Sequence, residues 1–203
     1  MTSTPNQLWR MFYAVELPEE FKARFAEHAA RLREAAPDVK ASWERPEKIH
    51  VTVKFVGEVG EERVGALSEA AGRVAAQAEP FDLTVGGTGA FHTQGNPRVL
   101  WVGVEDESGG LARVQERLED ECSALGIPRE TRPFHPHLTV ARLRAAAGAK
   151  QLGTLHRATA FESASFRVTE LVLMRSELGP GGSEYTVVSR HAFERARDTE
   201  DAA

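Results

Sequence analysis

The sequence predicts an α+β fold with two similar lobes of sheet and helix. Apolar periodicity divides the chain into strand, helix, strand, helix, two strands, helix, strand, helix and two strands, which approximates one β/α unit repeated. The chain has 203 residues, of which 41% are hydrophobic, enough to bury a sizeable core. These observations favour one bilobal domain over residues 1–193 and a charged, disordered tail over 194–203.

The first half of the chain alternates between strand and helix patterns. Residues 8–17 alternate and are aromatic-rich, as in a strand, and Pro18 then opens a helix that ends at Pro37. Residues 49–56 read as a second strand, and 61–78 as a second helix. The apolar stripes expected to face the core are Phe21, Phe25, Ala29 and Leu32 in the first helix and Val64, Leu67, Ala71, Val74 and Ala78 in the second.

The second half repeats these patterns. Strands are expected at 81–91 and 98–105, joined by a turn at 94–97, and a helix at 109–125. A strand at 137–143, a helix at 145–157 and strands at 166–176 and 184–192 follow, with a glycine-rich turn at 179–182 between the last two. Cys122 falls on the apolar stripe of the third helix, so it is interpreted as a core residue.

Composition limits the kind of protein. The net charge of −5 argues against a broad, sequence-independent nucleic-acid binder, although it leaves room for an enzyme that engages only an RNA end. One cysteine rules out an internal disulfide and a multi-cysteine metal site, and no secretory or membrane-spanning segment is recognisable. A cytoplasmic monomer without a membrane association is therefore expected.

Two short segments share a pattern, one in each half of the chain. His50-Val51-Thr52-Val53 and His137-Leu138-Thr139-Val140 each contain a histidine, an apolar residue, a threonine and a valine. In a strand, alternate side chains point the same way, so His and Thr share one face within each copy. The pair therefore predicts one site built from two matched strands.

The arrangement resembles the two-histidine (2H) phosphoesterase superfamily, and within it the RNA 2',3'-cyclic phosphodiesterases, once called 2'-5' RNA ligases. The similarity extends over most of the chain and includes residues 8–18, 49–59, 97–104 and 134–142. It implies two lobes related by pseudo-two-fold symmetry, with antiparallel-rich sheets, outer helices and a central active-site groove carrying one motif from each lobe.

The resemblance implies an RNA 2',3'-cyclic 3'-phosphodiesterase that leaves a 2'-phosphomonoester. His50 would be the proton donor to the leaving oxygen and His137 the base that activates water, since imidazole titrates near neutrality. Thr52 and Thr139 would donate hydrogen bonds to the phosphate. No cofactor and no metal are expected, and the partner is an RNA with a 2',3'-cyclic phosphate end, tRNA fragments among the candidates.

Other residues near the motifs have two interpretations each. Lys54 shares the phase of His50, so it would attract phosphate or be a solvated strand lysine. Phe55 would stack on a base, but its phase favours the core. Arg142 would enter the site only through a bulge or a strand end. Trp43, in an expected loop, would form part of the groove wall or serve the fold.

The remaining histidines carry weaker signals. His135 lies two residues before His137, a spacing found in metal pairs, but Pro136 and the lack of nearby carboxylates favour a groove-edge or structural residue. The other four are expected on surfaces or edges: His28, His92, His156 and His191.

Alternative functions stay open. The same machinery would serve hydrolysis of small cyclic nucleotides or ADP-ribose cyclic phosphates, or the reverse 2'-5' ligation. A non-catalytic module that binds RNA ends is a further alternative, although binding alone would not require two titrating groups.

Overall fold

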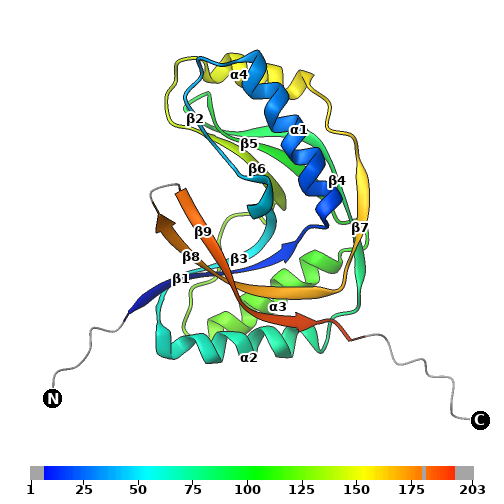
Figure 1. Ribbon diagram of the computed structural model, residues 1–203. Helices are drawn as coiled ribbons and strands as arrows, with labels where there is room; N and C mark the ends of the chain where they lie inside the picture. The colour runs from blue at the N-terminus through cyan, green and yellow to red at the C-terminus, as the bar shows by residue number, and fades with distance from the viewer. Residues whose placement is uncertain (1–6, 180–181, 195–203) are drawn as a thin grey trace, which may run out of the picture.

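Two antiparallel sheets, each covered on its outer side by helices, make up the computed structural model, which describes residues 7–179 and 182–194 (Figure 1). The first sheet has the order β3-β1-β8-β9, and the second has the order β2-β6-β5-β4-β7. The strands of the first sheet are β1 (Leu8–Glu16), β3 (His50–Gly60), β8 (Glu170–Gly179) and β9 (Gly182–Ala192). Those of the second are β2 (Ala41–Trp43), β4 (Phe81–Thr93), β5 (Asn96–Glu105), β6 (His137–Leu143) and β7 (Ala164–Val168). The predicted α+β fold is confirmed.

Two of the helices pack in the lobe opposite to that of the strand that precedes them. The four α-helices are α1 (Glu19–Ala35), α2 (Val64–Ala75), α3 (Gly110–Ala124) and α4 (Ala149–Ala158), and two 3-10 turns, η1 (Pro46–Lys48) and η2 (Glu61–Arg63), precede β3 and α2. α1 follows a strand of the first sheet, yet it packs beside α4 over the second sheet (Figure 1). α3 follows β5 of the second sheet, yet it packs with α2 against the first. Each lobe therefore contains parts of both halves of the chain.

The helical stripes predicted from the sequence are the faces that the helices bury. α1 buries Phe21, Phe25 and Leu32, and α3 buries Cys122 on its apolar face. α4 begins at Ala149, four residues after the predicted start. Gly148 precedes it with a φ of 74°, a left-handed conformation that a helix interior does not accept.

The strand predicted at 166–176 is two strands in different sheets. β7 pairs with β4, whereas β8 pairs with β1 in the other lobe. No glycine or proline interrupts residues 164–176, so the sequence gave no sign that the chain changes sheets between Val168 and Glu170. Trp43, expected in a loop, instead ends the short edge strand β2, opposite Ala141 of β6.

Both motif strands contain a β-bulge at the fourth residue of the motif. In β3, Thr52 pairs with Ala14 and Lys54 with Tyr13, so Val53 is an extra residue. In β6, Thr139 pairs with Trp101 and the residue two further on with Leu100, so Val140 is the extra residue. Each bulge lies three residues after the motif histidine. Beyond it, the residues point to the face opposite to the one that simple alternation predicts.

One continuous hydrophobic core joins the lobes. It includes Met11 and Val51 of the first sheet as well as Leu100 and Val140 of the second. Because both sheets contribute to one core, the lobes are parts of a single packed unit. Within the described ranges, no helix is long and apolar enough to span a membrane. The expected disordered tail, apart from its first residue, and two residues of the expected 179–182 turn lie outside the described residues.

Candidate active site

The two motifs occupy equivalent positions in their sheets. His50 and Thr52 are half-buried on one face of β3 while Val51 is buried on the other, and His137, Thr139 and Leu138 repeat this pattern in β6. β3 lies beside the central strand β1, and β6 lies beside β5. The shared face predicted for each His and Thr pair is confirmed.

Each motif histidine is held by the same backbone contact. His50 Nδ1 lies 2.8 Å from the carbonyl oxygen of Lys48, and His137 Nδ1 lies 2.8 Å from the carbonyl oxygen of His135. A carbonyl only accepts, so Nδ1 carries a hydrogen in both rings and donates it. The neutral form of each ring therefore has an unprotonated Nε2, the nitrogen left for proton transfer.

Aromatic rings fix the planes of both imidazoles. His50 packs against both Phe12 and Tyr185, with centroid separations of 4.9 and 5.0 Å, and these two rings also contact each other at 5.4 Å. His137 packs edge-on against Phe91 at 4.9 Å. Neither Phe12 nor Tyr185 was recognisable from the sequence, because β1 and β9 reach His50 only through the pairing of the first sheet.

The two motif strands, β3 and β6, lie in different sheets yet approach one another. Burial lowers the pKa of His50, and positive charge on His137 and Arg142 lowers it further. Burial also lowers the pKa of His137, with a further contribution from Arg142. Arg142 thus lies close enough to influence both imidazoles, one in each sheet.

One acidic side chain distinguishes the two histidines. Glu16 is the direct cross-strand partner of His50, and its negative charge raises the pKa of His50 against the effect of burial. The backbone hydrogen bonds, to Lys48 for His50 and to His135 for His137, also raise the pKa of each ring, so Glu16 is the difference between them. The two rings therefore share geometry but differ in their charged surroundings.

The bulges correct the predictions made from simple alternation. Phe55 is not a core residue: it is 58% exposed on the face of His50, and its ring centroid lies 6.1 Å from that of Phe12. Lys54 is neither solvated nor directed at the site, because it is buried and pairs with Glu119 at 2.6 Å. Arg142 is exposed on the face of His137, through the bulge that its entry required. We refer to His50, Thr52, Phe55, His137, Thr139 and Arg142 as the site.

The other histidines divide into buried and exposed groups. His28 and His156 were expected near the surface, but they are buried between α1 and α4 with a 3.0 Å contact between His28 Nε2 and His156 Nδ1. This contact joins residues 128 positions apart, so no local pattern indicated it. His135 is exposed at the edge of the site against Phe91 and Trp101. In the described part of the chain, no group of three or more potential metal ligands is present.

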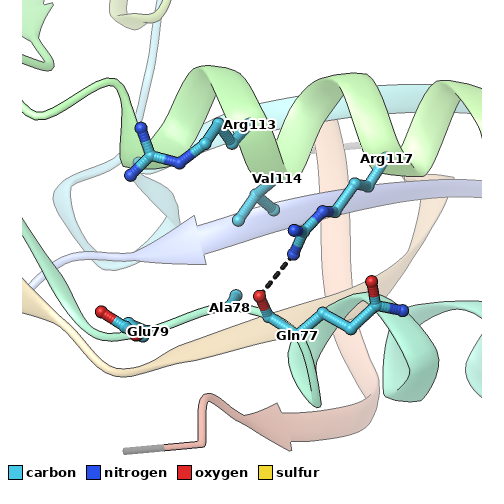
Figure 2. A pocket seen from close by; sticks show the side chains of 7 residues that line it. Gln77, Ala78, Glu79, Arg113, Val114 and Arg117 are labelled. Atoms are coloured by element: carbon cyan, nitrogen blue, oxygen red, sulfur yellow. Dashed lines mark hydrogen bonds between the residues drawn. The ribbon is translucent and has the colours of Figure 1, made fainter. Parts of the chain in front are cut away.

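Two hollows lie elsewhere on the molecule. One, of about 250 Å³, lies between the segment that follows α2 and the first half of α3, where Arg117 donates to the carbonyl oxygen of Gln77 (Figure 2). The neighbouring hollow, of about 650 Å³, is lined by Glu79, Arg113 and Arg167 among others. Neither is lined by a motif residue, so the motif chemistry belongs to the site and not to these hollows.

A two-lobed α+β fold with paired His and Thr motifs defines a class of phosphoesterase, and comparison with known proteins identifies the family. Residues 15–180 match the family model described as the 2'-5' RNA ligase superfamily, and the chain belongs to this family. An RNA 2',3'-cyclic phosphodiesterase of Methanothermobacter thermautotrophicus is 33% identical over 87% of this chain and 95% of its own length. One from Thermus thermophilus is 33% identical over 95% of this chain and 94% of its own. The structure of Escherichia coli LigT complexed with 3'-AMP has a TM-score of 0.73 and 29% identity, covering 93% of this chain and 100% of that one.

Proposed function

We propose that this protein hydrolyses the 2',3'-cyclic phosphodiester at the end of an RNA, with His50 and His137 as acid and base and without a metal ion. The observation that carries the proposal is the matched pair of imidazoles. Each ring donates a hydrogen bond from Nδ1 to a backbone carbonyl and leaves Nε2 for proton transfer. The charge of Arg142 lowers the pKa of both rings. The relatives named as RNA 2',3'-cyclic phosphodiesterases support the choice of substrate.

The proposed reaction is an in-line displacement at phosphorus. His137 Nε2 takes a proton from water as the water oxygen bonds to phosphorus. The bond from phosphorus to the 3' oxygen breaks, and His50 Nε2 gives its proton to that oxygen. The products are a 2'-phosphomonoester and a free 3' hydroxyl.

The surroundings of the two rings support this division of roles. An acid and a base acting together require one protonated and one neutral imidazole. Burial lowers the pKa of both rings, and Glu16 opposes that lowering at His50, which favours His50 as the proton donor. Arg142 and the hydroxyls of Thr52 and Thr139 supply positive charge and hydrogen-bond donors for the phosphate oxygens. All these groups come from one chain, so a monomer suffices.

The test is incubation with an RNA oligonucleotide that ends in a 2',3'-cyclic phosphate, in the presence of EDTA. We expect a 2'-phosphate product, and loss of about 10²- to 10⁴-fold in turnover for His50→Ala and for His137→Ala. His92→Ala, a change at an exposed histidine outside the motifs, is the matched control and should retain activity. A 3'-phosphate product would refute the bond assignment, and activity that EDTA abolishes and added metal restores would refute the mechanism.

The same assay distinguishes the alternatives. A binding module would retain the RNA without turnover in the unaltered protein. A small-molecule hydrolase would show a higher kcat/KM for a 2',3'-cyclic mononucleotide or ADP-ribose cyclic phosphate than for the oligonucleotide. Either result would replace the proposed substrate class.

A further inference from the structure

The start of β9 reaches the surroundings of His50 from a distant part of the sequence. Lys48 Nζ donates to the carbonyl oxygen of Ser183 at 2.8 Å and pairs with Glu184 Oε2 at 2.6 Å. The next residue, Tyr185, places its ring edge-on to His50 with a centroid separation of 5.0 Å. Three consecutive residues of one strand therefore contact either His50 or the residue that holds it.

Lys48 connects β9 with the imidazole. Its backbone carbonyl accepts the hydrogen of His50 Nδ1 at 2.8 Å, while its side chain binds Ser183 and Glu184. The peptide that orients His50 is thus fixed by the side chain of the same residue. Because the side chain of Lys48 is only 9% exposed and its ammonium already has two partners, it is poorly placed to bind substrate directly.

His137 is held by a different arrangement. Its acceptor is the carbonyl of His135, an exposed residue whose ring packs edge-on against Phe91 and Trp101. Within the described residues, the residue that holds His137 is therefore supported by aromatic contacts, whereas the residue that holds His50 is supported by the Lys48–Glu184 ion pair. The two histidines have the same local hydrogen bond but different supports behind it.

We propose that Lys48, anchored to Ser183 and Glu184, is a positioning residue that holds His50 in its Nδ1–H form with Nε2 available for the leaving oxygen. A group held in this way transfers its proton in a defined direction, and a small misplacement reduces turnover. The proposal rests on the proposed function for its catalytic consequence. The orientation of His50 itself does not depend on which substrate is hydrolysed.

The variants are Lys48→Met, Lys48→Arg and Glu184→Gln. Glu177→Gln is the matched control, because it removes a carboxylate of the same hairpin that pairs with Arg175 at 2.7 Å. We expect Lys48→Met to lower kcat on the cyclic-phosphate RNA on the order of 10- to 100-fold, with KM within about twofold. Lys48→Arg should recover part of the loss, Glu184→Gln should lower kcat less, and Glu177→Gln should match the unaltered protein.

A spectroscopic measurement separates positioning from general damage to the fold. Long-range ¹⁵N–¹H correlation of His50 without substrate should show the Nδ1–H tautomer in the unaltered protein and a mixture of tautomers in Lys48→Met. Urea unfolding shows whether each variant is folded. If Lys48→Met is not folded, the tautomer of His50 and kcat are compared in Glu184→Gln instead.

Two outcomes would overturn the positioning role. One is an unchanged tautomer together with an unchanged kcat, and the other is a raised KM at constant kcat, which would indicate substrate binding by Lys48. If His50→Ala instead retained full turnover, the proposed function would fail, while the tautomer measurement would still report on the hold that Lys48 has on the ring.

Discussion

Replacing Lys54 by Met should lower the free energy of unfolding by about 3 to 5 kcal/mol. The side chains of Lys54 and Glu119 are 2% and 4% exposed, and Lys54 Nζ lies 2.6 Å from Glu119 Oε2. Glu119 also accepts from Gln115 Nε2 and from the backbone N–H of Glu130, both at 3.1 Å. The pair therefore joins β3 to α3 and to the segment that leads toward β6.

The magnitude follows from the burial of the pair. At 2.6 Å and an effective dielectric constant of about 20, the attraction between the charges is on the order of 6 kcal/mol. Much of this offsets the cost of removing both ions from water, so the intact pair adds little net stability. Removal of the lysine alone loses the attraction and leaves the buried carboxylate of Glu119 with the neutral donors of Gln115 and Glu130.

Urea unfolding followed by circular dichroism measures the effect. The double variant Lys54→Met/Glu119→Gln should be more stable than Lys54→Met, because no buried charge remains and the amide oxygen still accepts from Glu130. Glu121→Gln, which breaks a more exposed ion pair between α3 and Arg73, is the control and should change the midpoint little. A loss below about 1 kcal/mol for Lys54→Met, or a double variant less stable than the single one, would refute the reasoning.

Three further changes test the buried histidines and the site. Burial holds the pKa of His28 at about 4, below its usual 6.5, so the unfolded chain takes up a proton first as the pH falls. Stability should therefore decrease by about 3 kcal/mol between pH 7 and pH 4, and urea titrations of His28→Asn should show a shallower decrease; an equal slope would count against this assignment. Arg142→Ala should raise the pKa of both motif histidines and lower kcat/KM on the order of 100-fold, and an unmoved pH–rate profile would contradict it. Phe55→Ala should leave the unfolding midpoint nearly unchanged because the ring is 58% exposed, yet raise KM for RNA through loss of base stacking, a contribution of about 1 to 3 kcal/mol; the buried Phe12→Ala should instead destabilise the fold, and a KM unaffected by Phe55→Ala would exclude stacking.

Sequence patterns within single helices and strands correctly predicted which face of each is buried and which side chains share a face. The apolar stripes of the helices gave their buried faces, including Cys122, because helical period alone decides which side chains align. The shared face of His50 and Thr52, and of His137 and Thr139, followed in the same way from strand alternation. These predictions extend only as far as the regular strand does.

Alternation failed at the first irregular residue. Val53 and Val140 are extra residues relative to β1 and β5, and the phase of each strand reverses after them. Phe55 therefore turns outward while Lys54 is buried. A bulge is defined by the pairing of two strands, so it is not a property of the sequence of one strand.

The sequence by itself determined most of the helices and strands, the two motifs and the membership of the four motif side chains in two matched strand faces. Only the tertiary structure decided which helices cover which sheet, where the chain changes sheets near Thr169, and what surrounds each imidazole. His28 and His156, or Lys48 and Glu184, meet only because distant segments pack together. Local periodicity specifies which face of an element is apolar, whereas contacts between elements depend on the packing of the whole core.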